Sequence, residues 1–358
     1  MTSDVVVIGG GIVGGTIAWR LAQAGVAVRL LEAGTWGAEA SWAGAGMLAP
    51  GGEVERAGAG AQLALEGREQ YAAYVRELCE AGGHEIDFRE CGAVELAAGE
   101  DEKISLLGRM DTQRQFGIAS QWLEPEQLRT KVPMLSDLAW SGAALYPCDA
   151  VVNPRELMHT LRIACESSGV RVREGAAVSE LVCAGSRVEA RTTAGEVHTA
   201  ESAVLAAGAW SSHVKLAGAG PVVESFPVRG HLLQFHMPPG WLGPILRHRH
   251  TYLFQRASGA LIAGATTEHA GFSREIDEAC VREIRQNTAK LLPALAGCEP
   301  DEVWNGLRPG AAQADPVVGR IPGSRLWTAY GHYRNGILMA PSTARIVAGE
   351  IISSWGTR

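Results

Sequence analysis

The chain has 358 residues, of which 46% are hydrophobic and 20% are charged, a composition typical of a globular protein large enough for two domains. Its net charge of −7, without a run of basic residues, argues against nucleic acid as a partner. The seven cysteines are scattered and form no Cys-x-x-Cys pair. This favours reduced thiols over a disulfide framework or a metal site and predicts a cytoplasmic protein. No stretch of about 18 uncharged apolar residues is present, so we expect no transmembrane helix.

A glycine-rich motif near the N-terminus predicts a dinucleotide-binding unit. Residues 5–8 are a short β-branched, apolar run typical of a buried parallel strand. Gly9, Gly11 and Gly14 then form the pattern Gly-x-Gly-x-x-Gly, and a helical pattern follows. The first glycine permits a tight turn, the second lets the backbone approach a pyrophosphate, and the third lets the helix pack on the strand. The helix start supplies free N–H groups and the positive end of a dipole for the phosphates.

Glu32 ends the second strand of this unit, where a carboxylate can accept hydrogen bonds from both ribose hydroxyls. Because a carboxylate there would repel a 2′-phosphate, the sequence disfavours a cofactor that carries one. A glycine-rich turn with a purely structural role is the alternative. The strand before the motif, the helix after it and the acid beyond it count against that alternative. The motif alone leaves NAD and FAD both open.

Two loop-like segments follow the motif. Residues 33–50 are rich in glycine and alanine and can run close to a bound ligand, although a plain flexible loop has the same composition. Residues 51–60 continue the loop and are a candidate for a mobile lid over a site. An amphipathic helix is expected over residues 61–80, where Tyr71 and Tyr74 lie on one apolar face.

From residue 86 onward short strands and helices alternate, until a pattern like that of the first unit returns. Asn153, Pro154 and Glu156 predict a helix start, with Asn as the N-cap and Pro at the first helical position. Residues 203–210 read as an apolar strand followed by a small-residue turn, and residues 221–235 as a long antiparallel strand. Further strands are expected at residues 86–88, 93–96, 143–146, 170–172, 252–255, 260–264, 302–307 and 326–330, and further helices at 100–115, 276–292 and 337–354.

Several segments together resemble the D-amino-acid oxidase-like family of FAD-dependent enzymes. They are GGGIVG with Glu32, ASWAGAGML, VVNP, VLAAGAWS, GLRPG and GHYRNGILMAP, and the similarity runs nearly end to end. Within the family they look most like the glycine oxidases of thiamine biosynthesis. The resemblance implies a mixed α/β fold, in which a Rossmann-type FAD-binding domain is interleaved with a β-rich, antiparallel substrate-binding domain. The first domain is expected at residues 1–84, 150–215 and 322–358, and the second at residues 85–149 and 216–321.

The resemblance also implies that the cofactor is FAD and assigns residues to it. It places Ile12 and Val13 at the pyrophosphate turn, and it places residues 332–338 around the pyrimidine edge of the flavin. Related sarcosine oxidases link the flavin through a cysteine in the region of residues 308–311, where this sequence has none, so non-covalent FAD is expected. The expected cofactor-binding residues are Gly9, Gly11, Ile12, Val13, Gly14, Glu32, Ala33, Ala40, Ser41, Ala45, Gly46, Met47, Val178, Gly208, His332, Tyr333, Arg334, Asn335, Gly336, Ile337 and Leu338.

The substrate-side assignments depend mainly on Arg308. It aligns with the family's carboxylate-binding arginine, and a guanidinium can bind a carboxylate through two hydrogen bonds. A structural or surface arginine is the alternative reading. Tyr252 aligns with a substrate-side tyrosine, and Arg334 has a weaker claim to help close the site. His250 is assigned no role as a base, and Thr267 replaces the bulky methionine of the glycine oxidases, which leaves the preferred small substrate open.

The resemblance implies oxidative deamination of glycine or another small amine or D-amino acid. Hydride transfer from Cα to flavin N5 would give an imine and then a 2-oxo acid (glyoxylate from glycine) and ammonia, and dioxygen would reoxidise the flavin to give hydrogen peroxide. Three alternatives stay open: a D-amino-acid dehydrogenase with a quinone or protein acceptor, a sarcosine-type oxidase, and a non-catalytic FAD-bearing subunit of a larger complex. The family also suggests a homotetramer.

Overall fold

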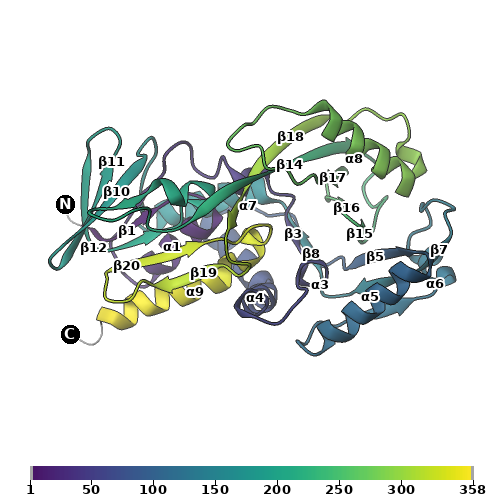
Figure 1. The fold of residues 1–358 in the computed structure, drawn as a ribbon, viewed down its shortest axis with the longest axis horizontal. Coiled ribbons are helices and arrows are strands. Elements are labelled where there is room, and N and C mark those ends of the chain that lie inside the picture. Colours follow the sequence, from purple (N-terminus) through teal and green to yellow (C-terminus); the bar gives the residue numbers. More distant parts are fainter. Residues whose placement is uncertain (1–2, 356–358) are drawn as a thin grey trace.

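The computed structural model describes residues 3–355, which form two large β-sheets joined by a small three-stranded one (Figure 1). The nine-stranded sheet occupies the left half of Figure 1, together with both ends of the chain, and the eight-stranded sheet occupies the right half. The chain passes from one sheet to the other several times. This mixed α/β architecture confirms the predicted fold class.

The nine-stranded sheet is built around the N-terminal strand β1 (Ser3–Ile8). β1 pairs in parallel with β2 (Val28–Leu31) on one side and with β12 (Val197–Leu205) on the other. Parallel pairing continues from β2 to β9 (Arg171–Arg173) and from β12 to β20 (Leu326–Tyr330). The glycine-rich turn therefore leaves the carboxyl end of a central strand, the usual place for a dinucleotide. The remaining strands of this sheet are β10 (Val178–Ala184), β11 (Arg187–Thr192), β13 (Lys215–Leu216) and β19 (Val317–Arg320).

The eight-stranded sheet contains a long antiparallel pair, β14 (Ser225–His236) with β18 (Glu302–Ala311). We expected the second of these strands to end at Leu307, but it continues through Arg308 to Ala311. The continuation is possible because Pro309 lies opposite Pro227, so two residues without an N–H face each other in the ladder. The other strands are β5 (Ala93–Ala98), β6 (Gln121–Leu123), β7 (Trp140–Tyr146), β15 (Ile245–His248), β16 (Thr251–Gln255) and β17 (Ala260–Gly264). The three-stranded sheet consists of β3 (Met47–Leu48), β4 (Phe88–Arg89) and β8 (Ala150–Val152).

Helices cover the sheets and bury the apolar core. The α-helices are α1 (Ile12–Gln23), α2 (Ala40–Ala43), α3 (Pro50–Glu53), α4 (Ala59–Gly82), α5 (Gly99–Arg114), α6 (Pro125–Lys131), α7 (Pro154–Ser167), α8 (Glu278–Leu291) and α9 (Gly336–Trp355). Two short 3₁₀ helices lie at Gly208–His213 and Pro293–Leu295. Trp19 of α1 and Tyr71 and Tyr74 of α4 are fully buried in one large cluster. Glycine at position 67 lets α4 approach α9, since a Cβ there would overlap the carbonyl oxygen of Leu338.

The predicted N-cap and first residue of α7 are confirmed, whereas Glu156 accepts a hydrogen bond from the N–H of Asp87 (2.7 Å) and forms no capping box. Asn153 accepts a hydrogen bond from the main-chain N–H of Arg155 (3.2 Å), and Pro154 is the first helical residue. An Asn N-cap of this kind is worth about 1 kcal/mol. The helix is followed directly by β9, which returns the chain to the nine-stranded sheet.

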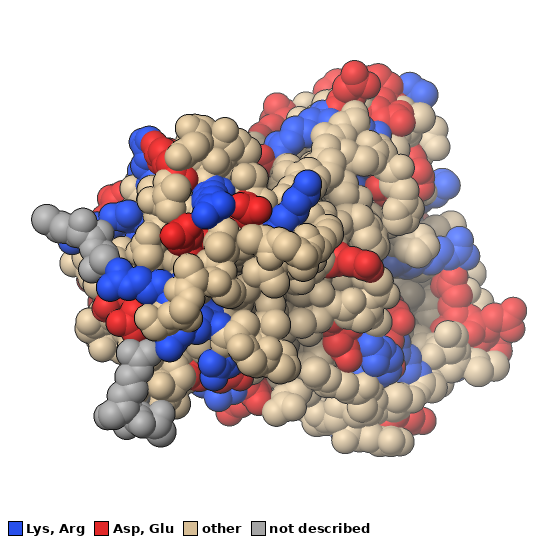
Figure 2. Space-filling model, turned by 60° about the vertical axis from the view of Figure 1, so that its left-hand side comes forward, with Lys and Arg blue, Asp and Glu red and all other residues tan. Residues whose placement is uncertain are grey.

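Every strand of the eight-stranded sheet comes from residues 85–149 or 216–321. Those residues also contain β19 and the last residue of β13, which belong to the nine-stranded sheet. The division of the chain into two domains stays a prediction. Within residues 3–355, no helix combines the length and the hydropathy needed to cross a membrane. Figure 2 shows acidic and basic side chains interspersed over one face of the molecule.

Candidate active site

A single cavity of about 360 Å³ joins the glycine-rich turn to the eight-stranded sheet. Its walls come from the turn after β1, the residues around α2, the turn after β12, strands β14, β16 and β18, and the start of α9. Of the predicted site residues, Gly14 and Leu338 do not line the cavity. The cavity is lined by Gly9, Gly11, Ile12, Val13, Glu32, Ala33, Ala40, Ser41, Ala45, Gly46, Met47, Val178, Gly208, Tyr252, Arg308, His332, Tyr333, Arg334, Asn335, Gly336 and Ile337.

The turn between β1 and α1 has no room for side chains. Gly9 has a φ of +110°, and a Cβ at this position would overlap the carbonyl oxygen of Ala206. A Cβ at Gly14 would overlap the carbonyl oxygen of Gly9. Gly14 therefore lets α1 pack against the end of the strand, although it does not line the cavity, and the backbone at Gly9 and Gly11 is open to a ligand.

The start of α1 is suited to a phosphate. Gly11 is the N-cap, and no acidic residue lies in the first turn, so the N–H groups and the positive end of the helix dipole carry no opposing charge. The hydroxyl of Ser41 accepts a hydrogen bond from the N–H of Ile12 (2.9 Å) and thereby fixes α2 to the same turn. Ser41, one of the predicted cofactor-binding residues, thus lies next to the glycine-rich turn.

Glu32 is held in place by two main-chain donors at the cavity wall. Its carboxylate accepts hydrogen bonds from the N–H of Gly10 (2.6 Å) and from the N–H of Gly34 (2.8 Å). Each carboxylate oxygen retains a further lone pair for a ribose hydroxyl. A side-chain-free turn, a helix start without an acidic residue and a fixed carboxylate together fit the pyrophosphate and ribose of FAD.

The start of α9 forms the opposite wall of the cavity. His332 is buried and shares a 3.0 Å hydrogen bond with the hydroxyl of Thr343. Burial lowers the pKa of His332 to about 4, so the ring is neutral at neutral pH. Tyr333 has a left-handed backbone, with φ of +47°. The N-terminus of α9 thus faces the cavity, with the positive end of its dipole, where the flavin was expected.

Arg308 brings a positive charge to the part of the cavity that the eight-stranded sheet lines. It is half-buried in β18, and its Nη1 donates to the carbonyl oxygens of Thr266 (3.1 Å) and Arg229 (3.3 Å). Among residues 3–355, no carboxylate forms an ion pair with it. Burial lowers the pKa of Arg308, since a charged group loses solvation there. An arginine in this state has donors and charge available for an anionic ligand.

Tyr252 lies beside Arg308 on the neighbouring part of the wall. The side chain is 6% exposed, and burial raises the pKa of its hydroxyl, which outweighs the opposite effect of Arg308 and Arg334. The hydroxyl therefore stays protonated and can donate a hydrogen bond. A Cβ at Gly264 would lie 2.7 Å from this oxygen, so the glycine in β17 makes room for the phenol.

Glu53 is a site residue that the sequence reasoning missed. It lines the cavity from the end of α3, and its carboxylate lies 3.5 Å from Nε of Arg334. Glu53 raises the pKa of Arg334 and is the largest contribution to that shift. Two hydrogen bonds from the Gln113 amide, to the carbonyl oxygens of Gly51 (2.8 Å) and Val54 (2.8 Å), hold this short helix in place.

Gly230 is a second missed residue, and it faces Arg308 from β14. A Cβ at Gly230 would overlap both terminal nitrogens of the Arg308 guanidinium. A glycine within a strand pattern indicates a close approach of this kind, so the signal was present in the sequence. The absence of a side chain at Gly230 thus leaves the space that the guanidinium of Arg308 occupies.

Other sequence-based suggestions fall outside the cavity. His250 and Thr267 are exposed and do not line it, which agrees with giving His250 no role as a base. The methionine-to-threonine difference at position 267 therefore does not change the cavity wall directly. In the proposed lid of residues 51–60, Gly51 is anchored by a hydrogen bond from its N–H to Asp149 (3.1 Å), whereas residues 55–59 are exposed.

Known proteins match nearly the whole length of this chain in sequence and in structure. The glycine oxidase of Geobacillus kaustophilus is 32% identical over 347 residues, which are 96% of this chain and 92% of that protein. The crystal structure of glycine oxidase from the same organism superposes with a TM-score of 0.92 at 31% identity, covering 98% of this chain and 95% of that one. The bifunctional protein ThiO/ThiG of Synechocystis sp. is 34% identical over 358 residues, but this chain spans only 52% of its length.

The family assignment follows from these matches. A family model named DAO, described as FAD dependent oxidoreductase, matches residues 4–350. The match includes the glycine-rich turn, the Arg308 strand and the start of α9. The chain therefore belongs to the DAO family of FAD-dependent oxidoreductases.

Proposed function

We propose that this enzyme oxidises glycine or another small amino acid, with FAD as the cofactor and dioxygen as the electron acceptor. The observation that carries the proposal is Arg308, whose guanidinium faces the FAD cavity without a carboxylate partner among residues 3–355. A substrate carboxylate would supply the missing counter-charge. The glycine oxidases among the relatives support a small amino acid as the substrate.

The residues of the chain would act by binding and orienting the substrate. The fork of Arg308 and the hydroxyl of Tyr252 would hold the carboxylate and so fix Cα relative to the flavin. FAD supplies the redox chemistry when bound, as the acceptor of two electrons from the substrate Cα–N unit. The neutral His332 and the N-terminus of α9 would favour negative charge on the adjacent edge of the cofactor. No acid–base pair of side chains is required if the substrate amine reacts in its neutral form.

FAD would be held without a covalent bond. The seven cysteines all lie in the described part of the chain, and none of them lines the cavity. Acid precipitation of the yellow protein should therefore leave FAD in the supernatant. Yellow colour retained in the pellet would refute non-covalent binding.

Anaerobic bleaching of the flavin tests the proposed reaction. Glycine, sarcosine, D-alanine and D-proline are compared side by side, and at least one of them should bleach the flavin and support oxygen consumption with peroxide release. A protein that reduces an artificial dye with these amines but consumes no oxygen would be the dehydrogenase alternative. Failure of every small amine to bleach the flavin would favour a non-catalytic subunit.

Arg308→Ala tests the site assignment. The variant should keep its FAD spectrum and lose turnover of glycine by at least about a hundredfold, because a charge-assisted pair of hydrogen bonds is removed. Arg320→Ala, at an exposed position outside the cavity, is the matched control. Glycine turnover within a few-fold of wild type in Arg308→Ala would contradict the assignment.

The biological setting is a second part of the proposal. The relative that carries ThiO and ThiG in one chain supports a role in thiamine biosynthesis. Restoration of thiamine-independent growth in a strain lacking its own glycine oxidase would test this role. The cytoplasmic location is proposed from the scattered cysteines, and the homotetramer from family resemblance. Light scattering of the purified protein would test the homotetramer.

A further inference from the structure

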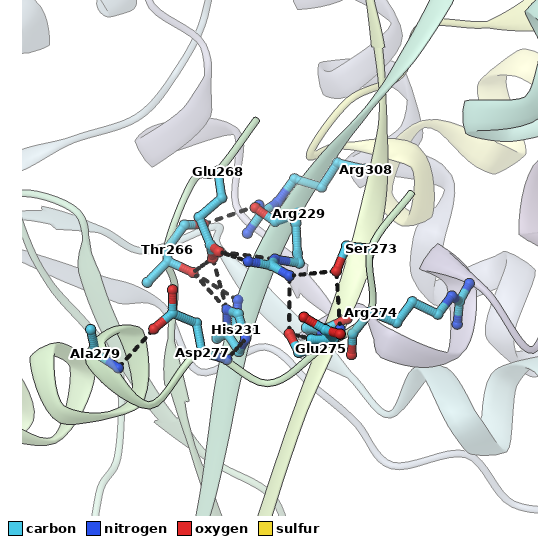
Figure 3. Close-up of polar contacts among 11 residues, drawn as sticks. Arg229, His231, Thr266, Glu268, Ser273, Arg274, Glu275, Asp277, Ala279 and Arg308 are labelled. Carbon is cyan, nitrogen blue, oxygen red and sulfur yellow. Dashed lines mark hydrogen bonds and ion pairs between the residues drawn. The ribbon is translucent and has the colours of Figure 1, made fainter. Parts of the chain in front are cut away.

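We propose that Glu268 is a positioning residue for Arg308. It acts through a polar group formed by the buried Arg229 and His231 and the half-buried Thr266 and Glu268, which we call the Glu268 cluster (Figure 3). The inference rests on the proposed role of Arg308 as the group that binds the substrate carboxylate. Figure 3 shows Arg308 next to Arg229, and Glu268 between Thr266, His231 and the guanidinium of Arg229.

The guanidinium of Arg308 is oriented by two main-chain carbonyl groups. Nη1 donates to Thr266 O at 3.1 Å and to Arg229 O at 3.3 Å. Carbonyl oxygens can orient the fork without neutralising its charge, so that charge stays available for an anion. The position of Arg308 therefore depends on the placement of these two carbonyl groups, and both belong to residues of the Glu268 cluster.

Main-chain hydrogen bonds fix the segments that carry the carbonyl groups of Arg229 and Thr266 relative to each other. Arg229 of β14 donates its N–H to the carbonyl oxygen of Glu268, and Glu268 donates its N–H to that of Arg229, each at 2.9 Å. Thr266 lies only two residues before Glu268. Residues 229 and 266–268 thus form one unit at the end of β17, beside the Arg308 strand.

The Glu268 carboxylate ties the side chains of this unit together. One oxygen accepts from Nε (2.9 Å) and Nη2 (2.6 Å) of Arg229, and the other accepts from the hydroxyl of Thr266 (2.5 Å). Burial acts to raise the pKa of Glu268, but hydrogen bonds from Thr266, Arg229 and His231 outweigh it and lower the pKa to about 2. Glu268 is therefore ionised at any pH at which the enzyme works.

His231 completes the group and anchors it to α8. The N–H of Asp277 donates to Nε2 of His231 (3.1 Å), which assigns the proton of the neutral ring to Nδ1. Nδ1 can then donate to Glu268 (2.7 Å). Asp277 is also the N-cap of α8, where its carboxylate accepts from the N–H of Ala279 (2.8 Å). A chain of hydrogen bonds thus extends from α8 to Arg308.

The same residues do not favour a metal ion. His231, Glu268 and Cys280 place three potential ligand atoms within 4.8 Å of one another. However, Arg229 already neutralises the carboxylate of Glu268, and a cation would lie close to that guanidinium. One nitrogen of His231 is occupied by a main-chain N–H, and the other is directed at Glu268. Hydrogen bonds within the chain account for the arrangement.

Thr266 offers a matched pair of substitutions in the FAD-loaded enzyme. Thr266→Val keeps the shape of the side chain but removes the hydroxyl, whereas Thr266→Ser keeps the hydroxyl. Acetate binding is measured from the change in flavin absorbance. The Thr266 hydroxyl donates to Glu268 (2.5 Å) and accepts from the main-chain N–H of His231 (2.9 Å), and the valine variant loses both bonds. It should raise the Kd for acetate about tenfold, and the serine variant by less than about twofold. The KM for glycine should rise in parallel, with kcat changed by less than about threefold.

A double-mutant cycle separates positioning from general stability. Arg308→Lys retains a cation but lacks the planar guanidinium that the two carbonyl groups orient. The Kd for acetate of the double variant Arg308→Lys/Thr266→Val should therefore exceed that of Arg308→Lys by less than about twofold. Glu268→Gln should behave as the valine variant does and keeps the inference testable if Thr266→Val fails to fold. Equal effects of valine and serine, or a full tenfold effect of Thr266→Val in the Arg308→Lys background, would overturn the inference.

The result also distinguishes this inference from the proposed function. If Arg308→Ala binds acetate as wild type does, the proposed role of Arg308 fails. If Arg308→Ala loses acetate binding while Thr266→Val and Glu268→Gln retain wild-type affinity, the positioning role alone fails.

Discussion

Glu53 faces Arg334 across the substrate end of the cavity, with 3.5 Å between a carboxylate oxygen and Nε. Arg308 lines the same end and has no such partner among the described residues. The two guanidinium groups and one carboxylate together leave a net charge of one positive unit. This balance matches a ligand with a single carboxylate.

Removal of the Glu53 charge should shift the preference toward ligands with two carboxylates. In Glu53→Gln, Arg334 loses its counter-charge and can pair with a second carboxylate. We expect the ratio of acetate Kd to malonate Kd to rise about tenfold, a free-energy change of about 1.4 kcal/mol. Flavin absorbance titrations measure both constants. Glu66→Gln, which removes the half-buried partner of the exposed Arg345, is the control. An unchanged ratio in Glu53→Gln would show that the pair does not set the charge of the site.

A methyl group at position 230 should displace Arg308 without affecting FAD. The Cβ of Gly230→Ala would overlap the guanidinium, so the arginine has to turn away from its two carbonyl acceptors. The KM for glycine should rise about tenfold or more, the equivalent of one lost charged hydrogen bond. In the control, Gly243→Ala, the new Cβ meets no atom within 4 Å. Steady-state kinetics on FAD-saturated protein measure the KM for glycine of both variants, and equal values would refute the prediction.

Gly14→Ala should separate α1 from β1 and weaken FAD binding. The added Cβ would overlap the carbonyl oxygen of Gly9, so the helix start must move away from the turn. We expect the Kd for FAD to rise at least about tenfold, because the helix N-terminus no longer faces the phosphates. Gly349→Ala, in the interior of α9 with no neighbour within 4 Å, should bind FAD normally. Fluorescence of released FAD reports both values, and normal binding by Gly14→Ala would count against the predicted packing role.

The buried His332 should make the enzyme sensitive to acid. An unfolded histidine titrates near pH 6.5, whereas the pKa of His332 in the folded protein is about 4. Between these values the unfolded state binds the proton and the folded state does not, so stability falls as the pH is lowered. This one group should cost about 2 kcal/mol of unfolding free energy between pH 7 and pH 5.

Replacement of the ring tests this pH dependence. His332→Gln can keep a hydrogen bond to Thr343 but does not titrate, so its unfolding free energy should fall less steeply below pH 6.5. The exposed His269 gives a matched control, His269→Gln. Urea unfolding at pH 7 and pH 5, with FAD in excess, measures the difference. Parallel curves for wild type and His332→Gln would contradict the low pKa.

Local patterns in the sequence predicted the elements that bind the cofactor. The spacing of Gly9, Gly11 and Gly14 followed by Glu32 depends on one strand-turn-helix-strand unit, and such a unit is encoded within about 30 residues. The start of α7 at Asn153 could likewise be predicted, because its capping depends only on residues adjacent in the sequence. Family resemblance identified Arg308 in the sequence. The strand that contains it was predicted to end before Arg308 and Pro309, but it extends to Ala311.

The parts that were missed depend on contacts between distant residues. Glu53 reaches the cavity only because Asp149 and Gln113 hold α3, and neither contact leaves a local signal. The Glu268 cluster requires β14 to lie beside both β18 and the end of β17. The hydrophobic alternation of these strands predicts that they pair, but not which residues face each other.

The cavity draws its walls from residue 8 through residue 337 of the chain. The glycine-rich turn precedes β12, β20 and the start of α9 along the chain, and all of them are needed before the cavity has all its sides. An N-terminal fragment that ends before α9 presents the phosphate turn without the wall that faces the flavin. A chain that lacks these later elements therefore has no complete cavity in which to retain the cofactor.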